Sequence, residues 1–154
     1  MEQRLDYTEQ GHDALRAMYS LEGYLRHSSI EPMLLHLLKF RVSQVNGCAY
    51  CLHMHVTEAR ADGETEDRIY LLDAWREAPC YTERERAALA WTEALTLIAD
   101  SHAPDEDYAA LQAQFTEEEQ VNLTLAITTI NAWNRIAIGF RSVPDVGGSG
   151  GARR

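Results

Sequence analysis

The sequence predicts an all-α protein of about seven helices, and three observations support this fold class. Apolar residues recur at intervals of three and four along most of the chain, which is the period of an amphipathic helix. The segments 82–85 and 116–119 both have the Thr-x-x-Glu pattern of a capping box, which marks a helix N-terminus. No segment shows a convincing strand pattern, so we expect an architecture built from helices alone.

Four helices are expected in the first half of the chain. The first covers about residues 8–28, and the second covers residues 32–46, with a proline in its first turn. The Asn-Gly pair that follows is typical of a helix C-terminus, because Gly47 can adopt a left-handed cap without steric cost. A third helix then covers about residues 48–62, and a fourth covers about residues 65–75.

The second half of the chain is expected to contain three helices. One covers about residues 82–99, a short one begins at Pro104, and the last begins at the second capping box. The last helix carries apolar residues on more than one side, so it must be central or lie at a subunit interface. At 154 residues the chain is expected to be one domain, residues 1–143, followed by a disordered glycine-rich tail, residues 144–154.

Composition restricts the partners and the location of the protein. The formal net charge is -10, from 24 acidic and 14 basic residues, so nucleic acid and anionic membranes are disfavoured as partners. The N-terminus lacks the apolar core of a signal peptide, and no apolar run approaches the roughly 18 residues needed to span a bilayer, so we expect a cytoplasmic protein. In that reducing compartment a close pair of cysteines is expected to be catalytic or metal-binding.

Two of the three cysteines lie at the start of the third expected helix. Cys48 is at or near the helix N-terminus, where unpaired backbone N–H groups and the helix dipole favour a thiolate. Cys51 and His55 follow at i+3 and i+7, so the three side chains share one helix face. His36 lies about ten residues before the Asn-Gly turn and His55 about eight after it, so an antiparallel hairpin is expected to bring the two imidazoles together.

The segment 48–55, Cys-Ala-Tyr-Cys-Leu-His-Met-His, resembles the Cys-x-x-Cys-x-x-x-His signature of the alkylhydroperoxidase D-like (AhpD-like) branch of the carboxymuconolactone decarboxylase superfamily. The resemblance extends over about residues 34–81 and includes shorter stretches near residues 82–87 and 131–135. It implies an AhpD-like helical fold with the cysteine pair at the start of a helix in a helical hairpin. This chain departs from the family at His36, where relatives usually have a glutamate that orients the motif histidine.

The resemblance implies a peroxiredoxin-type alkylhydroperoxidase that serves in antioxidant defence and uses no haem, flavin or metal. Cys51 would attack the peroxide, His55 would act as the base, Cys48 would resolve the intermediate as a disulfide, and His36 would orient His55. The family's reductant is a dithiol such as a lipoyl-bearing protein, which would react through the more exposed Cys48. Relatives are commonly homo-oligomers, trimers or hexamers, and the same state is expected here.

Several alternatives remain open from the sequence. Helix-dipole reasoning alone favours Cys48 rather than Cys51 as the attacking thiol. Cys48, Cys51, His55 and His36 together would form a Cys2His2 zinc site, with structural rather than catalytic consequences. The remaining alternatives are a non-catalytic, stress-linked binding module and an enzyme of the decarboxylase branch, which would need no thiol.

Overall fold

The computed structural model describes residues 2–146. Within that range the helices are joined by turns and loops, and all of the regular secondary structure is helical. The all-α fold class is therefore confirmed. The helices are α1 (Tyr7–Gln10), α2 (His12–Arg26), α3 (Pro32–Asn46), α4 (Ala49–Ala61), α5 (Glu66–Leu71), the 3₁₀-helix η1 (Leu72–Ala74), α6 (Glu83–Thr96), α7 (Ile98–Ser101), α8 (Asp105–Gln114) and α9 (Glu117–Phe140). The predicted tail falls mostly on residues 147–154, which lie outside the described range.

The seven expected helices correspond to these elements, with three of them divided. The expected helix 65–75 is observed as α5 followed by η1. The first expected helix is interrupted at Gly11, where a Cβ atom would lie only 2.8 Å from the Tyr7 carbonyl oxygen. The expected helix 82–99 is interrupted at Leu97, which separates α6 from the four-residue α7. Both capping boxes are formed, and Gly47 ends α3 in the left-handed conformation, with φ of 68°. Local sequence signals therefore locate most helix ends correctly.

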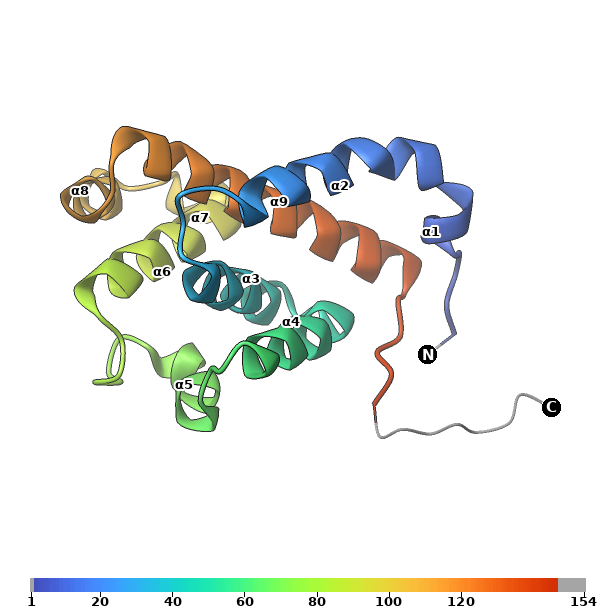
Figure 1. Cartoon of the computed structure of the whole chain (residues 1–154), viewed down its shortest axis with the longest axis horizontal. Helices are drawn as coiled ribbons and strands as arrows, with labels where there is room; N and C mark the ends of the chain where they lie inside the picture. Colours follow the sequence, from blue (N-terminus) through green and yellow to red (C-terminus); the bar gives the residue numbers. More distant parts are fainter. Residues whose placement is uncertain (1, 147–154) are drawn as a thin grey trace.

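Helix α3 lies at the centre of the molecule, with α4, α6 and α9 packed around it (Figure 1). Helix α2 runs alongside α9, and α3 forms an antiparallel hairpin with α4. The main core is formed by apolar side chains from α2, α3, α6, α8 and α9, including the fully buried Leu25, Leu38 and Ile127. The hairpin is thereby fixed on a packed scaffold, which suits a site that needs a rigid geometry.

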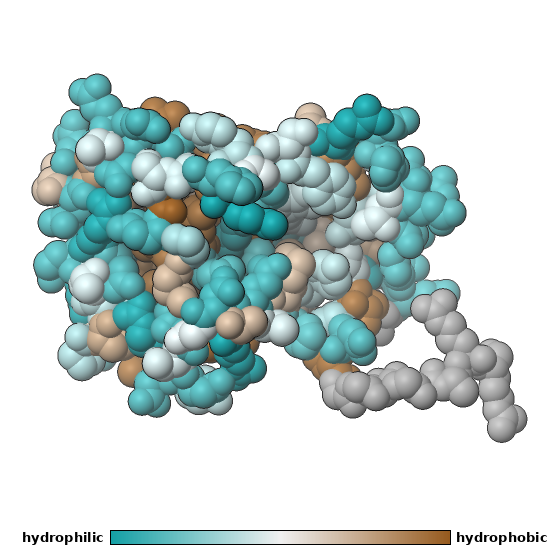
Figure 2. Space-filling model, in the orientation of Figure 1, coloured by the Kyte–Doolittle hydropathy of each residue, from teal (hydrophilic) through white to brown (hydrophobic). Residues whose placement is uncertain are grey.

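The apolar composition of α9 is explained by its central position. Most of its apolar side chains are buried or half-buried where the helix packs against α2, α3, α4, α6 and α8, while Val121 and Ile138 are exposed. A subunit interface is therefore not needed to explain the sequence of this helix, and the homo-oligomer stays a prediction. Figure 2 shows a largely hydrophilic face, as expected for a chain with a net charge of -10. No helix in residues 2–146 is both long enough and apolar enough to cross a membrane.

Buried asparagines connect the turn of the α3–α4 hairpin to α9. Asn46, the last residue of α3, donates to the side-chain oxygens of Asn131 at 2.9 Å and Asn134 at 3.0 Å. Asn134 is fully buried and donates in turn to the Ser43 hydroxyl at 3.2 Å. Asn131 and Asn134 therefore have a structural role, because they hold the end of α3 that leads directly into Cys48.

We expect Asn134→Ala to lower the free energy of unfolding by about 1–3 kcal/mol, because it removes a fully buried side chain and its hydrogen bonds to Asn46 and Ser43. Urea unfolding followed by circular dichroism measures the change. Thr128→Ala, on the exposed side of the same helix, is the control and is expected to change stability by less than about 0.5 kcal/mol. Equal stabilities for the two variants would contradict the role given to the asparagines.

Candidate active site

The two cysteines of the motif lie at the N-terminus of α4, as expected. Cys48 is the N-cap residue, and its sulfur accepts a hydrogen bond from the backbone N–H of Cys51 at 3.4 Å. The Cα atoms of the two residues are 5.4 Å apart, within the usual range for a disulfide, and their sulfurs are paired. The two side chains are therefore placed so that they can form a disulfide.

The expectation that Cys48 is the more exposed cysteine is wrong. Cys48 and Cys51 retain only 1% and 2% of their accessible surface. Both pack against Ala137 of α9, and Tyr50 partly covers them. Because α9 closes over the N-terminus of α4, position at a helix end does not expose the Cys48 sulfur. Cys51, in contrast, lines a cavity that is described below.

His55 is buried one turn beyond Cys51 and has a carboxylate partner on its own helix. Its Nδ1 atom lies 3.0 Å from Oε2 of Glu58, a half-exposed residue three positions further along α4. The hydrogen bond to His55 holds the pKa of Glu58 below its ordinary value, and the nearby positive charges of His36 and Lys39 act in the same direction. The Nε2 atom of His55 is buried without a hydrogen-bond partner among the described residues.

The predicted contact between His36 and His55 is wrong. His36 Nε2 instead bonds Oδ2 of Asp62 at 2.7 Å, beyond the last residue of α4. The reason is the register of the hairpin, because α4 begins at Ala49. His36 lies ten residues before the end of α3 while His55 lies only six after the start of α4, a difference of about 6 Å at 1.5 Å per residue. The position of the orienting residue is therefore occupied by Glu58.

The alternative Cys2His2 zinc site does not fit this geometry. Its four donors do not converge, because the cysteine sulfurs are paired with each other, His55 Nδ1 binds Glu58 and His36 binds Asp62. Within residues 2–146, no group of three or more histidine, cysteine, aspartate or glutamate side chains is arranged to hold a metal ion. The redox interpretation of the dithiol is thus the better match to the arrangement of these side chains.

A cavity of about 240 Å³ leads to Cys51 and His55. Four of its wall residues are aromatic, and the charged groups around it come from α2, α3 and α4. The remaining lining residues are Tyr7, Thr8, Tyr19, Glu22, Arg26, Lys39, Tyr50, Met54, Glu58, Trp133 and Ala137. Of the four predicted site residues, only Cys51 and His55 line this cavity, whereas Cys48 lies behind Cys51 and His36 lies in a neighbouring groove.

Sequence reasoning missed two features of the site. Glu58 could have been found from its i+3 spacing to His55, which places the two side chains on one helix face. The ion pair of Lys39 with Glu22, at 2.5 Å, joins α3 to α2 and has no local sequence pattern. His53, the other histidine of the motif, is exposed and lines a separate surface groove, so it takes no part in the site around Cys51.

Comparisons of the sequence and the fold with known proteins identify the family of this chain. The sequence model of the family described as "Carboxymuconolactone decarboxylase family" matches residues 12–94, more than half of the chain. This chain belongs to the carboxymuconolactone decarboxylase family. One relative of this chain is the uncharacterized protein YdfG of Bacillus subtilis. The two are 46% identical over 138 residues, which are 90% of this chain and 94% of YdfG.

One solved structure supports the AhpD-like assignment within the carboxymuconolactone decarboxylase family, and a second shares the fold. ATU0492 of Agrobacterium tumefaciens, described as a protein of unknown function and a candidate antioxidant defence protein AhpD, superposes with a TM-score of 0.92 at 47% identity, covering 95% of this chain and 100% of ATU0492. An uncharacterized peroxidase-related protein from Ralstonia eutropha, described as an AhpD core, gives a TM-score of 0.78 at 19% identity, covering 90% and 74% of the two chains. The second likeness concerns the fold alone. The predicted resemblance to AhpD-like proteins is confirmed.

Proposed function

We propose that this chain is a thiol-dependent peroxidase of the peroxiredoxin type that reduces alkyl hydroperoxides in antioxidant defence. The observation that carries the proposal is the arrangement of His55. Its Nδ1 atom is fixed by Glu58, and its Nε2 atom is unpartnered beside a cavity that Cys51 also lines. A buried imidazole with one nitrogen held by a carboxylate and the other free is suited to accept a proton from a neighbouring thiol.

In the first step, His55 takes the proton of the Cys51 thiol, and the thiolate attacks the terminal oxygen of the hydroperoxide. The O–O bond breaks, the alkoxide leaves and takes the proton from His55, and Cys51 becomes a sulfenic acid. In the second step, the Cys48 thiol attacks the Cys51 sulfur and a water molecule leaves. The product is the Cys48–Cys51 disulfide, and the proximity of the two sulfurs supports this step.

A dithiol reductant, such as a lipoyl-bearing protein, then returns the pair to the reduced form. One thiolate of the reductant attacks the disulfide, and its second thiol displaces the first, so two electrons and two protons reach the cysteines. Because Cys51 lines the cavity and Cys48 does not, we propose that the reductant attacks Cys51. The cycle needs no haem, flavin or metal. The cytoplasmic location and the trimeric or hexameric state remain predictions from the sequence.

The family name points to a second reaction, the decarboxylation of a lactone, which requires no thiol. Here the dithiol lies one helical turn from a histidine whose other nitrogen is held by a carboxylate. That combination favours thiol chemistry, so the peroxidase is the function that we propose.

Glu58→Gln tests the proposed role of the carboxylate. Loss of the charge that fixes His55 is expected to lower the rate of dithiol-dependent hydroperoxide consumption about 10- to 100-fold. His36→Gln is the matched comparison, because His36 bonds Asp62 rather than His55, and its rate is expected to stay within about twofold of the parent. A large loss in His36→Gln together with full activity in Glu58→Gln would reassign the orienting role to His36.

Glu58→Gln is also expected to differ from the parent in how its free energy of unfolding depends on pH. The folded-state pKa of Glu58 lies below its ordinary value of 4.5, so the stability that it contributes is present above that value and is lost as the pH falls through the lower, folded-state pKa. Urea unfolding is therefore expected to find the parent more stable than Glu58→Gln at pH 7, and to find that this difference decreases as the pH falls below 4.5. A difference that is independent of pH would contradict this.

A further inference from the structure

The cavity beside Cys51 has room for an organic molecule rather than hydrogen peroxide alone. Its volume of about 240 Å³ equals about eight water molecules at about 30 Å³ each. The rings of Tyr7, Tyr19, Tyr50 and Trp133 form much of its wall. Aromatic walls bury apolar groups favourably, so the cavity suits a substrate with a sizeable apolar part.

Most of the charged groups around this cavity already have partners. Glu22 accepts from Lys39 at 2.5 Å and from the indole N–H of Trp133 at 3.1 Å. Glu58 is engaged by His55 at 3.0 Å. The remaining charged lining residue, Arg26, makes no ion pair or side-chain hydrogen bond with any residue in the range 2–146. Arg26 is thus the one charged side chain of the cavity wall that has no side-chain partner in the described part of the chain.

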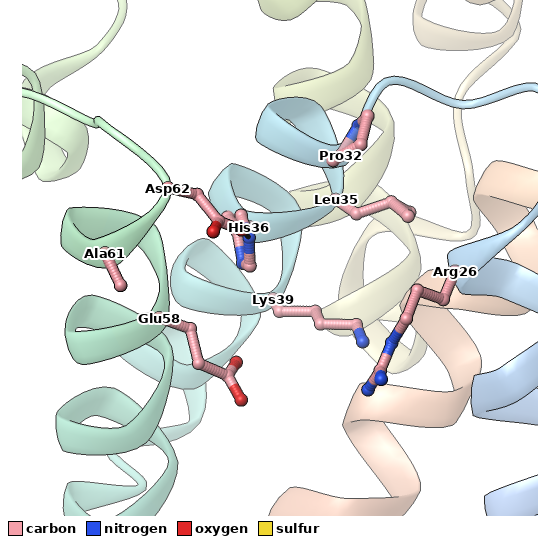
Figure 3. Close-up of a pocket in the computed structure, with 8 residues that line it drawn as sticks. All are labelled: Arg26, Pro32, Leu35, His36, Lys39, Glu58, Ala61 and Asp62. Atoms are coloured by element: carbon pink, nitrogen blue, oxygen red, sulfur yellow. Dashed lines mark hydrogen bonds and ion pairs between the residues drawn. The ribbon is translucent and has the colours of Figure 1, made fainter.

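Arg26 lines both this cavity and a second groove of about 360 Å³. Both spaces are lined by Arg26, Lys39 and Glu58, which reach them from α2, α3 and α4. Figure 3 shows the three side chains extending from these helices into the same opening. A molecule bound in the cavity beside Cys51 can therefore contact the Arg26 guanidinium.

We infer that the preferred substrates are organic hydroperoxides that carry a carboxylate, and that Arg26 binds this carboxylate. The apolar part of the substrate lies against the aromatic wall, and the hydroperoxide group faces Cys51. Guanidinium and carboxylate groups form paired, charge-assisted hydrogen bonds, which fix orientation as well as add affinity. This inference rests on the proposed peroxidase function and adds the class of its substrate.

The test compares the 13-hydroperoxide of linoleic acid with its methyl ester, which differs only in the charged group. The parent is expected to use the acid with the lower KM. Arg26→Gln is expected to lower the ratio of kcat/KM for acid over ester about tenfold, with the change in KM rather than kcat, and Arg26→Lys is expected to recover part of it. Arg16→Gln is the control, because Arg16 lies on the same helix, pairs with Asp13 at 2.8 Å and lines neither space.

Equal use of acid and ester by the parent, or an equal loss for both in Arg26→Gln, would overturn the inference. Binding of the corresponding hydroxy acid and hydroxy ester, measured by calorimetry, separates this failure from a failure of the proposed function. A protein that consumes no hydroperoxide but binds the acid more tightly than the ester, through Arg26, would refute the peroxidase while supporting the carboxylate site. Peroxidase activity without any preference for binding the acid would support the proposed function and refute the carboxylate site.

Discussion

Cys51→Ser is expected to lose hydroperoxide consumption by a factor of at least about 10³, because a serine hydroxyl stays protonated near neutral pH and cannot form a sulfenic acid. Cys48→Ser is expected to behave differently. It retains the attacking thiol, so it consumes one equivalent of hydroperoxide in a single turnover and then stops with Cys51 as a sulfenic acid. Peroxide consumption and labelling with a sulfenic-acid reagent such as dimedone, followed by peptide mass spectrometry, measure both outcomes.

The comparison of Cys51→Ser with Cys48→Ser also decides which cysteine attacks the hydroperoxide first. Cys80→Ser is the control, since Cys80 is half-buried in a separate apolar cluster with no cysteine partner, and it is expected to keep full activity. A sulfenic acid on Cys48 in the Cys51→Ser variant, with no labelling of Cys51 in the Cys48→Ser variant, would reverse the two roles. That result would agree with the helix-dipole argument, which favours the N-cap cysteine.

His55→Gln is expected to lower the rate of hydroperoxide consumption about 10²- to 10⁴-fold at neutral pH, because glutamine retains a polar side chain but cannot take the thiol proton. The rate of this variant should rise about tenfold per pH unit up to the ordinary thiol pKa of about 8.5, since the base must then come from solvent. Stopped-flow measurement of hydroperoxide consumption across pH 6 to 9 gives the profile.

His53→Gln is the matched control for His55→Gln. It removes an exposed histidine from the same helix, two residues away, that lines a different groove. We expect its rate and pH profile to match those of the parent. A full rate with an unchanged pH profile in His55→Gln would show that His55 is not the base.

The sequence predicts helices and caps well because these depend on local chemistry. The threonine caps of α5, α6 and α9 and the left-handed Gly47 were all predictable from side chains within a few positions of each helix end. The interruption at Gly11 was harder to predict, because the preceding four-residue helix depends on its Asp6 cap more than on any apolar period.

The site was only partly predictable, because its details depend on hairpin register and tertiary packing. The cysteine pair and His55 share one helix, so their spacing was sufficient. The erroneous pairing of His36 with His55 came from counting both residues from the Asn-Gly turn, although α4 begins two residues later, at Ala49. The burial of Cys48 by Ala137 and the placement of Arg26 beside Lys39 and Glu58 join residues far apart in sequence, and no local pattern specifies them.

The most direct measurement of the central claim is a single-turnover reaction of the reduced protein with one equivalent of cumene hydroperoxide. Product analysis gives the alcohol formed, and thiol labelling with peptide mass spectrometry gives the state of each cysteine. The account predicts one alcohol per chain, with Cys48 and Cys51 joined by the loss of two hydrogens and Cys80 still free. Unreacted hydroperoxide beside three free thiols would contradict it.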